Sequence, residues 1–269
     1  MFQGGAVVLP TLFVSHGAPT LPLVDAPVRD FLLGLGRAID ARHGRPRAIL
    51  AVSAHWETDV PRVNAVAVNG TIHDFRGFPP ALYNISYPAP GSPDLAGRVS
   101  ELLAEAGLAC ETDHARGLDH GAWVPVAMMY PQADIPVVQL SVQSHLGPAH
   151  HLAVGRALAA LRAEGVLILG SGSFTHDLAG FRSNDIDMPP PPYVSVFADW
   201  MDEAIREGRR DELLAYRRLA PEAAHNHPTE EHLLPLFVAM GAGGEELTPS
   251  HLHSSSNYGI LRMDAYSFA

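Results

Sequence analysis

The sequence predicts one α/β domain in which helices flank a central sheet of mixed, largely parallel strands. Two patterns predict it: apolar runs of strand character alternate with amphipathic helical segments, and neither a repeat nor a linker divides the 269 residues. The composition, 47% hydrophobic and 17% charged, allows a sizeable core. We therefore expect a single domain over residues 1–269, with its active site at the C-terminal ends of the strands, where open α/β sheets bind ligands.

The expected elements follow from apolar periodicity and from start and stop residues. The expected strands cover residues 6–14, 47–53, 63–68, 135–142 and 165–170, with a last one near 258–267. The expected helices cover residues 92–107, 150–165 and 230–244, and two more lie within 193–219, broken near Gly208. The first of these helices begins at Ser-Pro and ends at a glycine, which are the usual start and stop signals of a helix.

Two proline-containing stretches, 71–93 and 182–192, fit neither a helical nor a strand period. Irregular segments of this length inside a compact domain are usually functional. Because proline restricts the backbone, we expect them to be stiff walls of a site rather than flexible linkers.

The charged residues exclude several classes of function. The net charge is −11 and no basic run is present, which disfavours nucleic acid and anionic membranes as partners. All 18 basic residues are arginine, so a Schiff-base lysine, a P-loop lysine and a lysine general base are excluded. The single cysteine, Cys110, excludes an intramolecular disulfide and a cysteine-rich zinc site. With no signal-peptide pattern and no membrane-length apolar run, we expect a cytoplasmic protein.

Histidine recurs just beyond the ends of expected strands. His16 follows "LFVS", His55 follows "ILAVSA", and His176 follows "LILGSGSFT". A fourth candidate, His227, lies in "AHNHPTEEHLL" before an expected helix. A lone histidine at a strand end is more often a hydrogen-bonded structural residue. Three strand ends with the same feature favour a shared site, since parallel strands bring their C-terminal ends to one edge. We assign no role to His43, His114, His145, His150, His151, His225, His251 and His253, which we expect in loops or in solvent.

Imidazole ligands suit Zn, Fe, Cu or Ni and do not suit Mg or Ca. A site of two histidines and one carboxylate would suit non-haem Fe(II), and Glu230 or Glu231 could supply the carboxylate. Acidic residues are, however, common at the start of a helix for reasons of its dipole. "HPTEEH" does not match a zincin helix, because His227 and His232 would face different ways, about 140° apart around a helix.

Several long motifs resemble those of the class III extradiol ring-cleavage dioxygenases, and in particular the 4,5-DOPA extradiol dioxygenase-like branch. The motifs are "SHGAPT" (15–20), "SAHWET" (53–58), "HDFRGFPPALYNISYPAPGSP" (73–93), "DHGAWVPVAMMYP" (119–131), "QLSVQ" (139–143), "GSGSFTHDL" (170–178), "DMPPPPY" (187–193) and "HPTEEHLLPL" (227–236). The resemblance runs in order from about residue 10 to residue 240 and beyond.

The resemblance implies a non-haem metal enzyme that inserts both atoms of O2 into a catechol, with DOPA-like compounds favoured. It implies that His16 and His55 bind the metal and that His227 is the third ligand, where other class III enzymes have a carboxylate. Fe(II) is then the expected active metal, while an all-imidazole set also predicts Zn(II) in the isolated protein.

The resemblance implies that His176 is the acid–base residue, close enough to ligate the metal in a substrate-free zinc form. His120 is either a second polar group for the substrate hydroxyl or oxygen, or a buried histidine tied to Asp119. Four loop residues either wall an aromatic pocket or serve packing alone, and we favour packing; they are His73, Phe75, Tyr83 and Tyr87.

Two other functions remain open for the same histidines. One is a zinc-dependent hydrolase that uses a metal-activated water. The other is a non-enzymatic metal-binding or interaction protein that keeps the fold but has a closed, four-ligand site. The sequence does not predict an oligomeric state.

Overall fold

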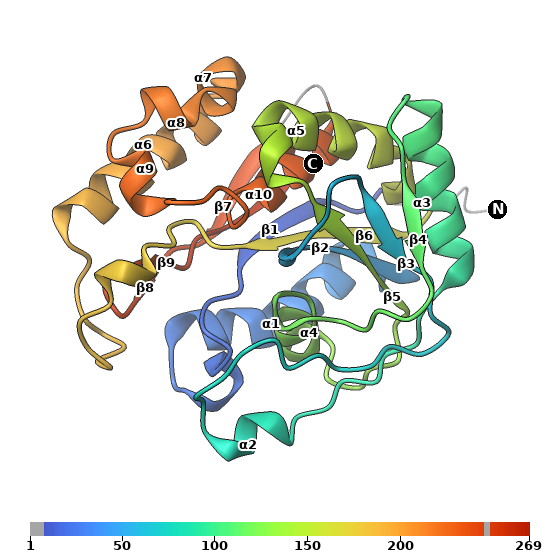
Figure 1. Ribbon diagram of the computed structural model, residues 1–269, viewed down its shortest axis with the longest axis horizontal. Helices are drawn as coiled ribbons and strands as arrows, with labels where there is room; N and C mark the ends of the chain where they lie inside the picture. Colours follow the sequence, from blue (N-terminus) through green and yellow to red (C-terminus); the bar gives the residue numbers. More distant parts are fainter. Residues whose placement is uncertain (1–7, 245–247) are drawn as a thin grey trace.

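The computed structural model describes residues 8–244 and 248–269, and its main feature is a central mixed sheet (Figure 1). The sheet has eight strands in the order β4-β3-β5-β2-β6-β1-β10-β7. The strands are β1 (Thr11–Ser15), β2 (Ala48–Glu57), β3 (Arg62–Asn64), β4 (Glu111–Asp113), β5 (Val137–Val142), β6 (Val166–Gly172), β7 (Pro249–His253) and β10 (Ala265–Phe268). A separate two-stranded sheet pairs β8 (Ser256–Asn257) with β9 (Leu261–Arg262).

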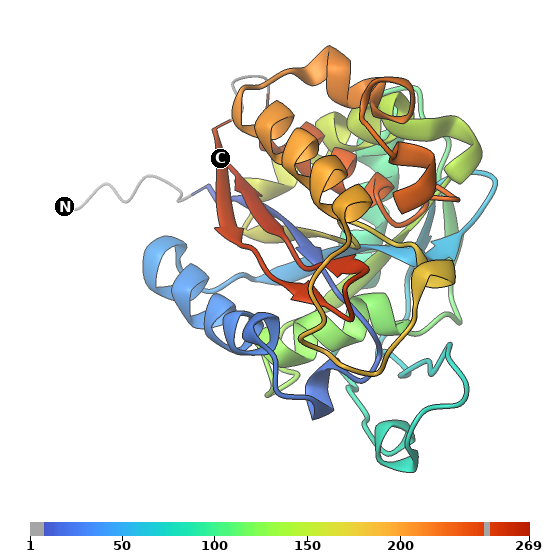
Figure 2. The same cartoon turned by 90° about the vertical axis from the view of Figure 1, so that its left-hand side faces the viewer.

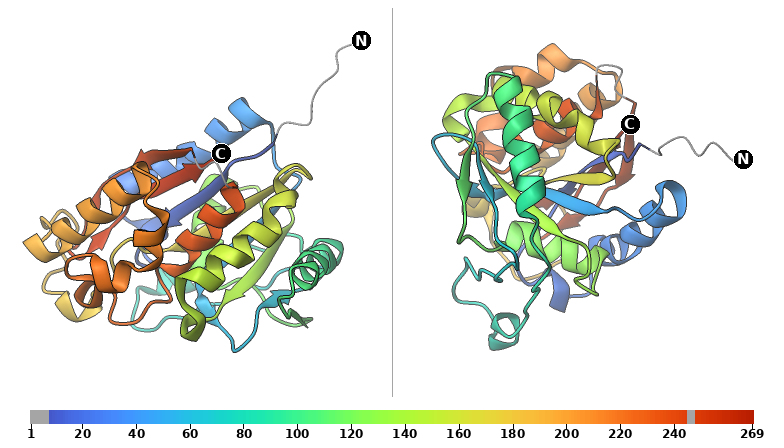
Figure 3. Two further views of the ribbon diagram at one scale, coloured as in Figure 1. Left: turned by 90° about the horizontal axis from the view of Figure 1, so that it is seen from above. Right: turned by 90° about the vertical axis from the view of Figure 1, so that its right-hand side faces the viewer.

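Helices cover both faces of the sheet, as Figure 2 and Figure 3 show from the side and from above. The helices are α1 (Pro27–His43), α2 (Pro80–Tyr83), α3 (Pro93–Glu105), α4 (His120–Met129), α5 (Gly147–Leu158), α6 (Pro192–Arg206), α7 (Arg210–Leu214), α8 (Tyr216–Leu219), α9 (Ala223–Asn226) and α10 (Leu234–Gly243). Neighbouring residues of β2 enter different cores: Leu50 packs with α3, α5 and α10, whereas Ile49 packs with α1 and α4. Burial on both faces explains why the central strands are apolar throughout.

The four central strands β5, β2, β6 and β1 are parallel to one another. The sheet continues with antiparallel pairing at both of its sides, to β3 beside β5 and to β10 and β7 beside β1. Val14 of β1 and Ser53 of β2 both pair with Ser171 of β6. The C-terminal ends of these strands therefore meet at one edge, as expected, and His16 and His55 lie there.

Some elements differ from the expected ones. Helices α1 and α4 were not expected; in α4 every residue except Ala127 is buried, so no polar face marks a helical period. The strand expected at 63–68 is shorter, the one expected near 258–267 is divided between β9 and β10, and residues 6 and 7 lie outside the described residues. The helix expected from residue 230 begins only at Leu234, next to Pro235, which suits a first turn. Among the described residues, no helix combines the length and the apolar character needed to cross a bilayer.

Candidate metal centre

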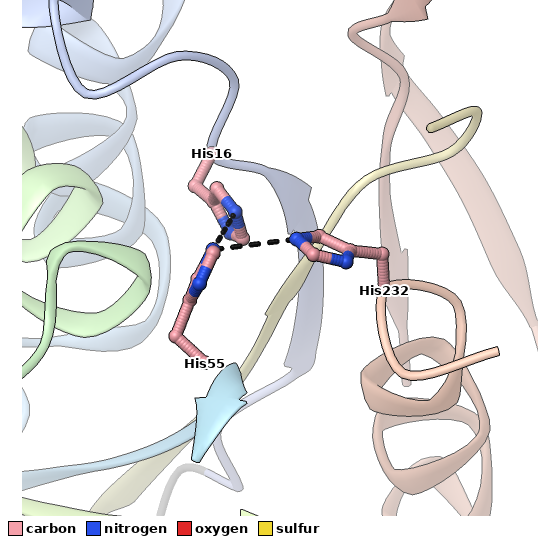
Figure 4. A group of neighbouring side chains, drawn as sticks. All are labelled: His16, His55 and His232. Carbon is pink, nitrogen blue, oxygen red and sulfur yellow. Dashed lines mark hydrogen bonds between the residues drawn. The ribbon is translucent and has the colours of Figure 1, made fainter. Parts of the chain in front are cut away.

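Three histidine rings converge at the C-terminal edge of the sheet (Figure 4). His16 follows β1, His55 lies near the end of β2, and His232 lies in the turn before α10. The Nε2 atom of His55 is 3.0 Å from Nε2 of His16 and 3.3 Å from Nε2 of His232. Together these residues form a group whose ring nitrogens could hold one metal ion.

The hydrogen bonds of His16 determine which of its nitrogens carries the proton. Its Nδ1 lies 3.1 Å from Ser171 Oγ. The Ser171 hydroxyl donates its single hydrogen to the carbonyl oxygen of Gly121, so it can only accept from His16. The Nδ1 of His16 is therefore protonated, and its Nε2 presents a lone pair to the other two rings.

Carboxylates give the other two rings the same tautomer. His232 Nδ1 is 2.9 Å from Glu231 Oε1, and His55 Nδ1 faces Asp74 Oδ2 at 3.5 Å. An ionised carboxylate only accepts, so Nδ1 of His232 carries the proton and its Nε2 is free. Asp74 makes no hydrogen bond to His55 at 3.5 Å, but its charge favours the same tautomer for that ring. Nitrogen lone pairs that face one another at these distances repel unless a proton or a metal cation lies between them. Nδ1–H bonds to carboxylate or hydroxyl groups are also the usual support of metal-binding histidines, so the residues fit a metal ion.

Burial keeps the three rings neutral. It lowers the pKa of His16 and of His232 well below 6.5, and the charges of neighbouring histidines lower both further. Burial, followed by the charge of His120, lowers the pKa of His55 to about 3. Neutral imidazole is the form that binds metals, so the site is ready for a cation at neutral pH.

The position of His55 reflects an irregularity in its strand. The register of β2 against β5 shifts between Val52 and Glu57, and His55 lies in this stretch. Such bulges are frequent beside active sites because they redirect a side chain.

The small residues of "GSGS" (170–173) position the turn that carries His232. A Cβ on Gly172 would collide with the carbonyl oxygen of His232, and the backbone N–H of Ser173 donates to that oxygen at 2.8 Å. On its far side the turn is held by Arg217, which donates to the carbonyl oxygens of His227 and Pro228.

The structure does not bring His227 to His16 and His55, so His227 is not one of the three converging rings. His227 is fully buried under α6 and α8, and its Nε2 lies 3.0 Å from the carbonyl oxygen of Phe174. Its Nδ1 has no hydrogen-bond partner among residues 8–244 and 248–269. The segment after His227 is a turn rather than a helix, and it delivers His232 to the site. Both histidines belong to "HPTEEH", so the motif contains the third converging ring, but the expected helix turned His232 away from His227 and hid this.

His176 lies against the cluster without joining the three converging nitrogens. Its ring stacks on that of His232 with centroids 3.5 Å apart and an interplanar angle of 13°. It also belongs to a second possible ligand group with Glu231 and His232. Burial lowers the pKa of His176 to about 4, although the charge of Glu231 opposes the shift.

His120, at the first position of α4, contacts the ring of His55 with centroids 3.9 Å apart. Its partner is Asp74 and not Asp119, at 2.9 and 3.0 Å from Nδ1 to the two carboxylate oxygens. Asp119 instead caps α4 by accepting from Ala122 N and accepts from the Ser53 hydroxyl at 2.6 Å. Asp74 and Glu231 were both missed as partners of the site histidines.

The loop 71–93 lies beside the cluster, and its aromatic residues divide by role. Phe75 is buried, and its ring lies edge-on to that of His120 with centroids 5.6 Å apart. The ring of the exposed Tyr83 lies on Phe75 with centroids 5.4 Å apart. Tyr87 is buried and donates to the carbonyl oxygen of Tyr130 at 2.8 Å, while His73 bonds to the carbonyl oxygen of Ile85. Phe75 is thus in contact with a site histidine, whereas His73 and Tyr87 hold the loop itself.

The chain resembles known proteins along nearly its whole length. Residues 10–266 match the family described as the catalytic LigB subunit of aromatic ring-opening dioxygenase. A 4,5-DOPA dioxygenase extradiol of Beta vulgaris is 48% identical over 265 residues, covering 96% of each chain. One from Escherichia coli is 41% identical over 244 residues, covering 89% of this chain and 88% of that one. The crystal structure of uncharacterized protein JW3007 from Escherichia coli K12 matches with a TM-score of 0.78 and 32% identity, covering 97% and 100% of the two chains.

Proposed function

The chain belongs to the LigB family of aromatic ring-opening dioxygenases, and we propose that it opens a catechol ring at a metal ion held by His16, His55 and His232. Family membership favours this reaction over the zinc hydrolase and the non-enzymatic protein that the histidines alone left open. The observation that supports it is the convergence of three Nε2 atoms, with His55 Nε2 3.0 and 3.3 Å from the other two.

The proposed working metal is Fe(II). When bound, it supplies open positions at which a catechol and O2 meet, since three protein ligands leave room in its coordination sphere. The ligand set contains imidazole and no carboxylate, so we also expect Zn(II) to be retained by the isolated protein.

His176 is the proposed acid–base residue. Because burial lowers its pKa to about 4, the ring is neutral near pH 7 and can accept the proton of a catechol hydroxyl. The same burial makes its protonated form a ready donor, so the ring can return the proton later in the cycle. We propose that Nε2 of His120, whose Nδ1 is bound to Asp74, meets the second substrate oxygen.

The proposed substrate class is a DOPA-like catechol. It is supported by the names of several relatives and by a cavity of about 570 Å³ that is lined by residues next to the cluster in sequence and not by its rings. This cavity starts at Asp177, the residue after His176, and also includes Arg182 and Pro228. A buried carboxylate and an arginine suit the ammonium and carboxylate groups of an amino-acid side chain.

The test is to load metal-free protein with Fe(II) under anaerobic conditions, add a panel of catechols, and then admit O2. We expect O2 uptake with a yellow ring-opened product, and faster turnover with DOPA than with unsubstituted catechol. Fe(II)-loaded protein that takes up no O2 with any catechol would contradict the proposed reaction. Equal kcat/KM for DOPA and catechol would contradict the substrate class alone.

A further inference from the structure

One carboxylate, that of Asp74, faces two different imidazoles of the site. Its Oδ1 and Oδ2 lie 2.9 and 3.0 Å from Nδ1 of His120, and its Oδ2 lies 3.5 Å from Nδ1 of His55. Oδ1 also accepts the backbone N–H of His120 at 2.9 Å, one of the N–H groups that the start of α4 leaves without a helical partner. The side chain is 21% exposed, so these contacts are partly shielded from water.

The loop around Asp74 is held in place independently of the two histidines. The backbone N–H of Ile72 donates to the carbonyl oxygen of Leu118, and its carbonyl accepts from Trp123 Nε1 at 3.1 Å. The contact of Tyr87 with Tyr130 anchors only the far end of the loop, 13 positions from Asp74, and does not hold the carboxylate itself. The carboxylate is therefore presented to the rings by a rigid segment, as a preorganised acceptor.

An ionised carboxylate offers only acceptor sites, and it has enough of them for both N–H groups. His120, which is hydrogen-bonded to the carboxylate through Nδ1, therefore carries its proton there and keeps a free Nε2. The carboxylate charge at 3.5 Å favours the same tautomer for His55. For His55 the free Nε2 lies among the three converging nitrogens; for His120 it is the nitrogen left to meet a substrate oxygen.

We propose that Asp74 is a positioning residue shared by a metal ligand and by the histidine that meets the substrate. It holds His55 and His120 in the same tautomer and in fixed orientation, so metal binding and substrate contact depend on one carboxylate. This inference rests on the proposed function for the role of His120, and on the ring geometry alone for His55.

The first test measures the tautomers directly. In metal-free protein with ¹⁵N-labelled histidine, long-range ¹H–¹⁵N spectra should show His55 and His120 protonated at Nδ1. Asp74→Asn keeps the shape but has one acceptor oxygen for two N–H groups, so at least one ring should shift toward the Nε2–H form. A wild-type spectrum with either ring protonated at Nε2 would overturn the proposal, and this measurement needs no variant.

The second test measures metal binding with Co(II), followed by its visible absorption. Loss of a carboxylate behind a metal-binding histidine typically weakens metal binding by about 10–100-fold, and we expect that for Asp74→Asn. The matched control is Tyr87→Phe, which removes an anchor of the same loop but leaves the carboxylate. It should lower Tm and leave Co(II) affinity unchanged. Unchanged Co(II) affinity in folded Asp74→Asn, or equal losses in both variants, would overturn the proposal.

A double-mutant cycle separates the two roles. At saturating Fe(II), Asp74→Asn should lower kcat in the wild-type background and have little further effect in the His120→Ala background. Its effect on Co(II) affinity should persist in that background, because it acts through His55. Additive losses of kcat would overturn the role at His120. The spectra and the Co(II) titration need no turnover, so a wild-type protein that cleaves no catechol contradicts the proposed function and leaves these two tests valid.

Discussion

At the scale of single residues, the rings of the metal centre can approach one another only because Gly121 has no side chain. A Cβ at this position would collide with Ser53 Oγ and lie 2.9 Å from Cδ2 of His55 and 3.3 Å from Cε1 of His16. The carbonyl oxygen of Gly121 also accepts a hydrogen bond from the hydroxyl of Ser171, the partner of His16. The glycine thus supports two of the converging rings at once.

Gly121→Ala should therefore weaken metal binding and destabilise the fold by about 1–3 kcal/mol, the usual cost of overpacking. Gly97 in α3 is the matched control, because a Cβ there meets nothing within 4 Å. Gly97→Ala should stabilise the protein by about 0.5–1 kcal/mol and leave metal content unchanged. Urea unfolding and metal analysis of both variants measure the contrast, and equal metal content in the two would refute it.

The two histidines of "HPTEEH" should respond differently to substitution. His232→Gln should lose metal, because it removes one of the converging nitrogens. His227→Phe should keep metal and lose about 1–3 kcal/mol of stability, because the bond to the Phe174 carbonyl is removed. Metal content and urea midpoints of both variants are the measurement. If folded His227→Phe lost its metal while His232→Gln kept it, the ligand set first expected from the sequence would be restored.

His176→Ala should separate proton transfer from metal binding. General acid–base catalysis typically contributes about 10²–10⁴ in rate, so we expect a loss of that size in kcat. Fe(II) and catechol binding should persist, since the nitrogens of His176 lie outside the three that converge. Single-turnover ring cleavage and metal content are measured on one preparation. Wild-type cleavage with weakened zinc binding would instead identify His176 as a fourth zinc ligand.

At the scale of elements, β6 and α10 pack backbone against backbone where β6 has glycines. A Cβ on Gly170 would collide with the carbonyl oxygen of Pro235 in α10, and one on Gly172 with that of His232. The small residues after "LIL" therefore allow α10 and the turn before it to pack closely against β6. That turn carries His232 of the candidate metal centre.

Alanine at the two glycines should have different effects on the site. Gly170→Ala and Gly172→Ala should each destabilise the protein by about 1–3 kcal/mol. Only Gly172→Ala should also weaken Zn(II) binding, because it displaces the backbone of His232 itself. Zinc titration of both purified variants decides this, and a matching loss of zinc affinity in Gly170→Ala would argue against it.

At the scale of the whole molecule, buried neutral histidines make the metal-free fold sensitive to acid. Burial lowers the pKa of His151, His176 and His227 to about 4 each. His151 was expected in a loop or in solvent, but it is buried in α5. The pKa shift of His251 has the opposite sign, because its hydrogen bond to Asp264 raises the pKa. Its contribution to stability is therefore present at low pH and is lost as pH rises.

A histidine with a lowered pKa stays neutral in the fold, while the unfolded chain takes up a proton below about pH 6.5. Stability should therefore fall as pH falls from about 6.5 toward 4, by up to about 1.4 kcal/mol per pH unit for each such histidine. Urea unfolding of metal-free protein at pH 7, 6 and 5 measures the slope. His151→Gln should reduce this slope, because one proton fewer is taken up on unfolding. Stability that is flat or rising toward pH 5 would contradict the prediction.

The sequence by itself determined the fold class, the apolar central strands and the presence of His16 and His55 where strands end. These features are local: an apolar run and the residue that follows it predict a strand and its exit, whatever the rest of the chain does. The motifs around them also indicated the dioxygenase family, which the match over residues 10–266 confirms. Helix α4 escaped prediction because it is buried on nearly all sides and shows no helical period.

Which histidine completes the cluster, and which carboxylates lie behind the rings, depends on how distant segments pack together. His227 and His232 are five positions apart in one motif, and the choice depends on the turn that packs its backbone against Gly172, far away in sequence. Asp74 reaches His120 and His55 across 46 and 19 positions of chain, through a loop without any period. Contacts of this kind are set by packing between distant segments, and no local pattern of residues records them.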